Sequence, residues 1–286
     1  MTARLFHVSS ILPLLLLVPL VATSQSASTG TPDGALVGRA LAAELRTAQD
    51  THHPMRYRLH KSSPRMTSTK DICETKDGAV ALLLAVNDRP LSPADEQKEQ
   101  TRLNALLGDP GKQKHRKQSE DDDTARAMKV LRAMPKAFIY KFEGAGTGPT
   151  GRVEKFTFKP NPDFDPPDLE TQVLTEMTGE LWIDASEERV TRLEGHLQQD
   201  VDFGWGILGK LSKGGWIVIE QADVGDHQWR IVRFQMVMSG RVLFKTRSFD
   251  TVEEESNFRP VSVGLGYAQA IRMLRAGSDA AVQSSR

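Results

Sequence analysis

The residue types best suited to hold a metal ion are seven histidines and one cysteine. The histidines are His7, His52, His53, His60, His115, His196 and His227. None of them stands in an HxxxH or HExxH spacing, and Cys73 has no second cysteine with which to share a zinc ion. The acidic run at residues 120–123 lacks the spaced ligands of a calcium loop and is interpreted as solvent-exposed charge at the start of a helix. We therefore predict no metal site and no cofactor.

A glycine-rich segment at residues 144–152 is a candidate for phosphate binding. Gly146 and Gly151 have the spacing of a P-loop. That motif also needs a lysine followed by serine or threonine, and a helix whose N-terminus faces the phosphate. Here Arg152 and Val153 open an alternating strand instead. The segment is predicted to be a flexible hairpin loop.

Catalysis by a serine triad or by paired acids has little support. The sequence Gly-x-Ser-x-Gly does not occur. Carboxylate pairs at residues 200/202 and 253/255 are expected by chance in a chain with 37 acids. An enzyme would need His196, Asp200 and Asp202 to converge in a cleft, which the sequence does not indicate. We predict no catalytic residues and no enzymatic activity.

Composition excludes a nucleic-acid binder. Lys+Arg and Asp+Glu are equal at 37 each, whereas nucleic-acid recognition needs a clustered basic excess. The chain is 39% hydrophobic and 26% charged, which is typical of a folded protein. The single cysteine, Cys73, cannot form an internal disulfide. It is predicted to be buried and inert rather than paired with a partner.

The first residues predict export. Arg4 precedes an apolar run at residues 11–22, and the small residues Ala22 and Ser24 follow, as in a signal peptide spanning residues 1–24. Cleavage is expected before Gln25, with cleavage after Ala27 as the alternative. The run is shorter than the roughly 20 residues of a membrane span, and no lipobox cysteine follows it. We expect a soluble periplasmic protein without a membrane span after cleavage, with secretion as the alternative.

The mature chain begins with a helical pattern. Apolar residues on one face predict a helix at residues 34–50, with Asp33 as N-cap, after a flexible stretch at residues 25–33. Its apolar stripe must be buried, most simply on the sheet that follows. Extended segments are predicted at residues 55–61, 65–73 and 79–86. Residues 264–286 are predicted to be a C-terminal helix or tail, partly disordered.

A helical, partly mobile insertion is predicted at residues 92–134. Ser92 and Pro93 form a helix start, and a polar helix runs to residue 107, where residues 108–111 stop it. A charged stretch follows at residues 112–123. A second helix is predicted at residues 124–134, capped by Asp123 and ended by Pro135.

The second half of the chain is rich in strands. Turn residues separate the predicted strands, among them Ser239 and Gly240. Repeated strands with tight returns and few helices between them indicate an antiparallel sheet. The predicted strands are residues 137–143, 153–159, 174–184, 189–199, 215–221, 228–239 and 241–253.

One stretch carries a family resemblance. Residues 177–185 read G-x-hydrophobic-W-I-D, and residues 190–194 return as V-x-R-L-E. With further matches over roughly residues 79–260, the chain resembles the lipoprotein-carrier (LolA/LolB-like) superfamily, and more narrowly the exported outer-membrane lipoprotein-sorting proteins. The other matches are D-R-P-L-S at residues 88–92, F-x-F-x-P-x-P at residues 156–162, L-x-K-L-x-K-G at residues 208–214 and R-x-L-F-K at residues 241–245.

The resemblance implies a fold and a function. It implies an α+β fold, in which a curved antiparallel sheet forms an incomplete barrel at residues 34–263 and the N-terminal helix covers its open side. In carrier members the cavity holds acyl chains and no chemistry is performed. The first hypothesis is therefore a non-enzymatic periplasmic carrier, expected to be a monomer, that takes an apolar ligand, a lipid acyl chain or a lipidated protein. The insertion at residues 92–134 is an addition to the carrier core.

The residues expected to contact such a ligand come from the apolar strands. They are Trp182, Leu193, Trp216, Val218, Val232, Phe234 and Met236. Which of them point inward depends on strand register, because a slip of one residue reverses every side chain. An ordinary helix-on-sheet core is the alternative explanation of these apolar faces. The competing function is a protein-interaction or envelope-sensing module, with a core filled by its own side chains and the charged insertion as docking surface.

Overall fold

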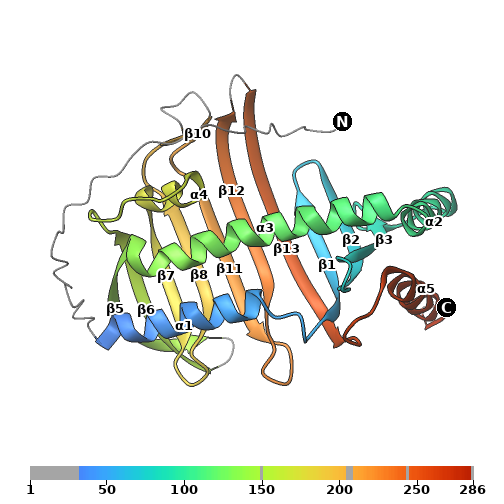
Figure 1. The fold of residues 1–286 in the computed structure, drawn as a ribbon, viewed down its shortest axis with the longest axis horizontal. Helices are drawn as coiled ribbons and strands as arrows, with labels where there is room; N and C mark the ends of the chain where they lie inside the picture. Colours follow the sequence, from blue (N-terminus) through green and yellow to red (C-terminus); the bar gives the residue numbers. More distant parts are fainter. Residues whose placement is uncertain (1–31, 149–150, 204–208, 243–244, 285–286) are drawn as a thin grey trace, which may run out of the picture. The chain divides into compact units, whose positions relative to one another are not determined.

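A single curved antiparallel sheet organises the structure. The computed structural model describes residues 32–148, 151–203, 209–242 and 245–284. The strand order is β4-β3-β2-β1-β13-β12-β11-β8-β7-β6-β5, with β9 and β10 attached beside β12, and the two ends of the sheet do not pair (Figure 1). The predicted fold class is confirmed. The strands are β1 Met55–Ser63, β2 Met66–Cys73, β3 Val80–Val86, β4 Arg89–Pro90, β5 Phe138–Gly148, β6 Gly151–Pro160, β7 Met177–Asp184, β8 Arg189–Leu197, β9 Val201–Phe203, β10 Gly209–Leu211, β11 Trp216–Asp223, β12 Trp229–Val242 and β13 Lys245–Pro260.

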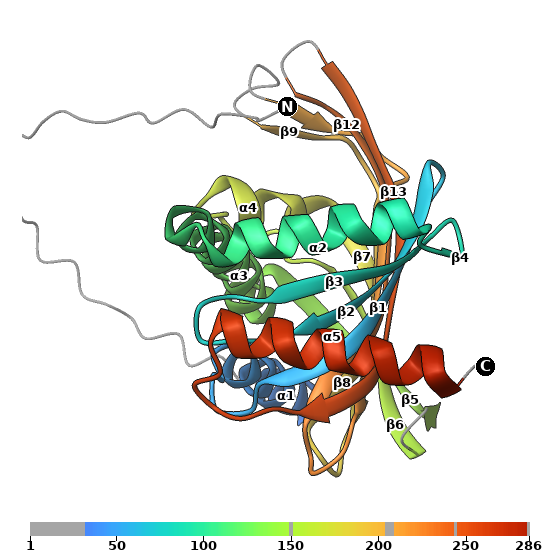
Figure 2. The same cartoon turned by 90° about the vertical axis from the view of Figure 1, so that its right-hand side faces the viewer.

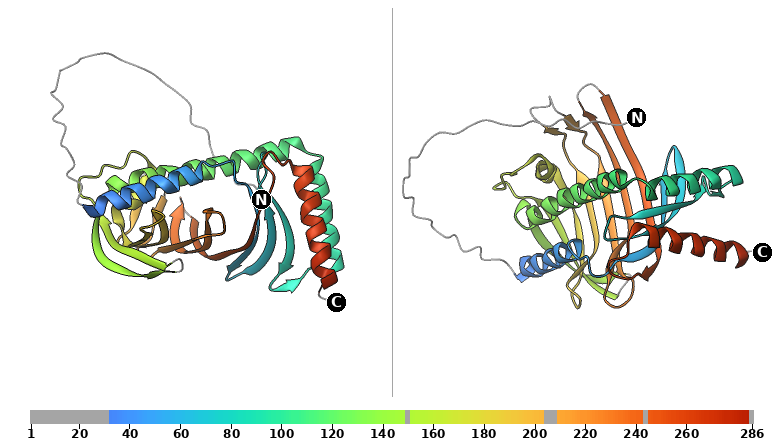
Figure 3. Two further views of the ribbon diagram at one scale, coloured as in Figure 1. Left: turned by 90° about the horizontal axis from the view of Figure 1, so that it is seen from below. Right: turned by 45° about the vertical axis from the view of Figure 1, so that its right-hand side comes forward.

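The helices divide between the two faces of the sheet. α1 (Pro32–Ala48) and α3 (Pro110–Ala137) lie across the open, concave side, as Figure 3 shows from below. α2 (Pro93–Leu107) and α5 (Tyr267–Ser284) lie beside β2 and β3 at the other end of the sheet (Figure 2). A short helix, α4 (Leu169–Gln172), and one 3-10 turn precede β7. The C-terminal helix belongs to the same compact unit as the sheet.

Two hydrophobic clusters hold these layers together. The first joins α1 and the end of α3 to β5–β8, with Leu41, Phe156 and Leu181 almost fully buried. The second joins α2 and α5 to β2 and β3, with Leu103 and Ile271 fully buried. Cys73 belongs to the second cluster and is buried, as predicted. Burial raises the pKa of its thiol to about 11.

The register places the two clusters on opposite faces of the sheet. Arg233 of β12 is paired with Glu254 of β13, and Glu254 is paired in turn with His60 of β1, so the three side chains lie on one face. Arg58 stands two residues before His60 and therefore lies on the same face. Arg58 pairs with Asp71, and Asp71 shares its face with Cys73 of the second cluster. The first cluster lies on the other, concave face. The first cluster reaches β12 at Met236 and Met238, and neither cluster includes a described residue of β1 or β13, so the concave face of β1 and β13 lies outside both.

The exposed edge of β3 is capped by side chains of α2 and α3. Glu99 accepts a hydrogen bond from the backbone N–H of Leu83 at 2.8 Å, and Arg102 donates to the carbonyl of Ala81 at 2.6 Å. Further along, Ala79 donates to Glu120 at 2.9 Å and accepts from Arg116 at 3.2 Å. Unpaired edge groups invite association with other chains. The inserted helices thus close an edge that would otherwise be free.

α3 differs from its prediction because it is one long helix. It begins at Pro110, where Asp109 accepts from the N–H of Lys112 at 2.9 Å, so the residues that end α2 also start α3. The charged stretch is helical throughout, with pairs such as Lys117–Asp121 one turn apart. Pro135 sits in the last turn and does not end the helix before it.

Three turn predictions are also corrected. α1 begins at Pro32, so Asp33 lies in its first turn rather than before it. The glycine-rich segment is mostly strand, since β5 and β6 pair as far as Gly148 and Gly151. Ser239 and Gly240 continue β12, where a side chain at Gly240 would collide with the carbonyl of Lys210 on β10.

The expected signal peptide at residues 1–24 lies outside the described residues. Within the part of the chain that is described, no helix is both long and apolar enough to cross a bilayer.

Candidate ligand site on the concave face

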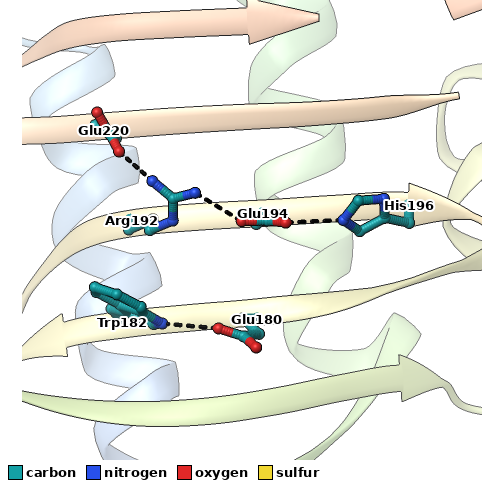
Figure 4. A network of polar contacts seen from close by, with 6 residues as sticks. All are labelled: Glu180, Trp182, Arg192, Glu194, His196 and Glu220. Carbon is teal, nitrogen blue, oxygen red and sulfur yellow. Dashed lines mark hydrogen bonds and ion pairs between the residues drawn. The ribbon is translucent and has the colours of Figure 1, made fainter. Parts of the chain in front are cut away.

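A chain of polar contacts identifies the convex face of the central strands. Arg192 pairs with Glu194 at 2.7 Å and with Glu220 on the neighbouring strand, and His196 contacts Glu194 at 2.9 Å (Figure 4). α1 and α3 pass behind these strands in Figure 4, so the polar side chains point away from the helices. Hydrogen bonds from Arg192 and His196 hold the pKa of Glu194 below its ordinary value.

Trp182 belongs to this convex network. Its indole N–H donates to Glu180 at 3.1 Å, and the Lys155 ammonium lies 3.8 Å from the centre of its ring. Arg192 approaches the same ring at 5.6 Å. These cations occupy the π-surface that an apolar ligand would need.

The seven predicted contact residues therefore divide between two faces. Trp216, Val218 and Glu220 stand two residues apart along β11, so all three side chains lie on one face of the sheet. Glu220 pairs with Arg192 of the convex network, so this is the convex face, which Trp182 shares. Leu193 and Met236 pack on the first cluster, and Phe234 lies opposite Ile219 on the same concave face. Val232 is the extra residue of a β-bulge between Ile231 and Arg233. The structure thus brings together Leu193, Phe234 and Met236.

The residues of the proposed enzyme site do not meet. His196 lies on β8, whereas Asp200 pairs with Lys210 at 2.7 Å and Asp202 lies on β9. Among the described residues, no hydrogen bond or ion pair joins His196 to either aspartate. Among the residues that the structure describes, no three potential metal ligands lie close enough together to hold an ion.

The concave face of β11, β12, β13 and β1 carries an apolar strip. Ile217, Ile219, Phe234, Met236 and Leu59 lie on it and are half-buried. Ile217 and Met236 pack against the edge of the first cluster, whereas Ile219, Phe234 and Leu59 lie outside both clusters.

The middle of α3 supports the same conclusion. Every residue from Asp121 to Ala127 is exposed, which covers almost two full turns and hence all sides of the helix. A helix that is polar on all sides is typical of a solvated bridge held by its own side-chain pairs. This free span of α3 (residues 121–127) crosses the concave face without resting on it.

Ionisable groups line the concave face beside the apolar strip. Glu253 pairs with Lys61 at 2.6 Å, and Tyr57 stacks on Phe258 at 5.4 Å. Burial raises the pKa of Glu255 to about 7, helped by the negative charges of Glu253 and Glu74. Burial likewise raises the pKa of Tyr57. These shifts describe a surface poorly solvated by water although it is not filled by the core.

A hollow of about 600 Å³ opens at the lower end of this face. The end of α1, the β2–β3 loop, α3 and the segment before α5 surround it. Its charged and polar lining includes Asp50, His52, Glu74, Lys76, Lys117 and Arg230. Burial raises the pKa of Glu74, whose Oε2 accepts a hydrogen bond from the N–H of Met55 at 2.8 Å. We call this hollow the mouth.

The sequence did not point to Tyr57, Glu74, Arg230 or Glu255 as site residues. The detectable signal was a set of polar residues alternating with apolar ones in strands that have an apolar face. Glu253 and Glu255 stood out only as a spaced pair of acids. Which face such residues occupy depends on pairing with strands up to about two hundred positions away in the chain.

Comparisons with known proteins give two similar solved structures. One is an outer membrane lipoprotein-sorting protein domain from Vibrio parahaemolyticus, with 10% identity, a TM-score of 0.31, and coverage of 82% of this chain and 96% of that chain. The other is a DUF1329 family protein from Desulfovibrio piger, with 12% identity, a TM-score of 0.32, and coverage of 83% and 97%. No family model and no curated protein matches the chain.

Proposed function

We propose that this protein is a non-enzymatic carrier that binds an apolar molecule, such as a lipid acyl chain, on its concave face. The observation that carries the proposal is the free span of α3, which passes over a half-buried apolar strip without packing on it. An exposed apolar surface inside a concave fold favours binding of an apolar ligand.

The contacts proposed for the ligand are narrower than the sequence suggested. Phe234, Met236 and Leu193 remain, and Ile219 and Leu59 join them. Trp182, Trp216 and Val218 lie on the convex face, where Val218 is buried, and are no longer proposed as ligand contacts. The expected setting is the periplasm, where a monomer would shield an acyl chain or the lipid of a lipoprotein between two membranes.

Binding of a fluorescent fatty acid tests the proposal. The chain offers a matched pair of variants on one strand, because Phe234 and Gln235 are both half-buried but point to opposite faces. Phe234→Asp places a charge in the apolar strip and is expected to weaken binding by more than about tenfold. Gln235→Asp is expected to change it less than about twofold.

Native mass spectrometry after gentle purification is the complementary measurement. A bound mass that disappears in Phe234→Asp supports the carrier function. Ligand-free protein together with no uptake of the fluorescent fatty acid contradicts it.

The competing function keeps one supporting observation, since the free span of α3 exposes three consecutive aspartates, Asp121, Asp122 and Asp123. If that span is a docking surface, replacing these aspartates by asparagine abolishes capture of a partner from envelope extract. Fatty-acid binding would then be absent in the unmodified protein, which separates the two functions.

A further inference from the structure

Arg230, on β12, is the arginine in the lining of the mouth. Its Nη2 donates to the backbone carbonyl of His53 at 2.6 Å, while its Nε is buried without a hydrogen-bond partner among the described residues. Arg233 on the same strand also has a buried Nε without a hydrogen-bond partner, but its guanidinium lies 3.6 Å from Glu254. Within the described residues, the guanidinium of Arg230 forms no ion pair. A half-buried guanidinium with a spare N–H is poised to bind an anion.

The mouth around Arg230 is electrostatically suited to a single negative charge. Lys76, Lys117 and Arg230 contribute three cations to its lining, and Asp50 and Glu74 contribute two carboxylates. Lys76 and Lys117 pair with Asp77 and Asp121, so Arg230 is the lining cation without an ion pair among the described residues. Both carboxylates are already engaged. Asp50 accepts from the N–H of His52 at 2.7 Å, and Glu74 accepts from the N–H of Met55 at 2.8 Å.

The mouth lies at the start of β1, the strand that carries Leu59 of the apolar strip, because Pro54 is part of its lining. Tyr57 follows Pro54 by three residues on β1 and lies on the concave face with Glu255 of β13. Glu255 is paired in register with Leu59 of the strip. A chain that starts at Arg230 would therefore pass Tyr57 and reach Leu59 and then Phe234.

Charge also sets the direction of such a ligand. The free span of α3 carries Asp121, Asp122 and Asp123 against one cation, Arg126, so it is negatively charged. An anionic group is repelled at that position and attracted at the mouth. A ligand with one acidic end and one apolar end thus has a single favourable orientation.

We propose that the mouth binds the carboxylate of an amphiphile through the guanidinium of Arg230, with the alkyl chain lying on the concave strip. This inference rests on the proposed carrier function and narrows it to singly charged, long-chain carboxylic acids. A phosphate head group would bring more negative charge beside Glu74 than the mouth can balance.

The test compares a fluorescent fatty acid with its methyl ester. Both are compared with a fluorescent alkyl phosphate, in which a phosphate monoester replaces the carboxylate. The unmodified protein is expected to bind the acid at least about tenfold more tightly than the ester or the phosphate. Arg230→Met should lower the affinity for the acid to that of the ester and leave the ester unchanged. Arg230→Lys should retain part of the preference, because it keeps the charge but not the guanidinium.

Arg233→Met is the matched control, because Arg233 lies on the same strand and points to the convex face. It should leave both affinities unchanged, and thermal melts should show that all variants are folded. Equal binding of acid and ester by the unmodified protein overturns the head-group site while the carrier function stands. Tighter binding of the phosphate overturns the carboxylate assignment. Failure of every probe to bind overturns the carrier function itself.

Discussion

Glu44 of α1 and Arg189 of β8 form a buried, two-pronged ion pair. Arg189 donates from Nε and Nη2 to the two carboxylate oxygens of Glu44, each at 2.9 Å, and both side chains are about nine-tenths buried. Glu44 also accepts from the N–H of Val190 and from Gln221, and Arg189 lies 5.4 Å from the ring of Trp229. One carboxylate thus ties the helix to two strands of the sheet.

Removing that carboxylate should be costly. Glu44→Ala leaves the guanidinium of Arg189 buried and unpaired, and we expect a loss of about 3 kcal/mol or more in the free energy of unfolding. Arg39→Ala on the same helix is the control, because its pair with Glu188 is exposed. That change should cost less than about 1 kcal/mol. Urea denaturation measures both, and equal losses would contradict the role given to Glu44.

The capped edge of β3 gives a second prediction. Burial tends to raise the pKa of Glu99, but hydrogen bonds from Arg102 and from the N–H of Leu83 hold it below its ordinary value. Glu99→Ala leaves the N–H of Leu83 without a partner, at an expected cost of about 1–3 kcal/mol. It also exposes an edge that can pair with another copy.

Denaturation curves and light scattering at increasing protein concentration measure these two effects. Lys98→Ala is the control, since Lys98 is on the same helix with its side chain 78% exposed. If Glu99→Ala stays as stable and as dispersed as Lys98→Ala, the capping role is wrong.

The sequence predicted the sheet but could not orient its strands. Residues 216–219 of β11 are apolar on both faces, so alternation offers no choice between Val218 and Ile219. The choice is made by Glu220, which pairs with Arg192 on a strand 28 residues earlier. The bulge at Val232 then shifts β12 by one position against β11. Such tertiary pairings leave no local pattern, which explains why the predicted contacts were divided between two faces.

The free span of α3 escaped prediction for a related reason. Residues 112–123 carry no apolar periodicity, because Arg116 and Glu120 contact the sheet edge through polar groups and residues 121–123 are exposed. Residues 108–111 end α2 and also start α3, but the sequence was interpreted only as the end of the first helix. The one observation that most supports a binding site is therefore invisible to hydrophobic patterning.

Cys73 gives a prediction about reactivity. Its side chain is fully buried, and the raised thiol pKa leaves little thiolate at pH 8. We expect Ellman's reagent to leave the native thiol unmodified for hours and to modify it fully in guanidinium. Ser119→Cys places a thiol on the exposed surface of α3 and should react within minutes. Native Cys73 reacting as fast as that introduced thiol would show that the second cluster opens readily.

Glu255 makes stability depend on pH in an unusual direction. Its pKa is 4.5 in an unfolded chain and about 7 in the fold, mainly because of burial. Between these values the folded protein keeps a proton that the unfolded chain has lost, so stability falls as pH rises through this window and levels off above it. The loss is up to about 3 kcal/mol. Urea denaturation at pH 5 and pH 8 should therefore show a smaller decrease in Glu255→Gln than in the unmodified protein. Glu254→Gln, whose side chain is exposed on the other face, should behave as the unmodified protein.

An apolar ligand on the concave face would bury Glu255 further, so fatty-acid affinity should also weaken above pH 7. This pH dependence of the affinity should vanish in Glu255→Gln. A pH dependence that persists in that variant would assign it to another group.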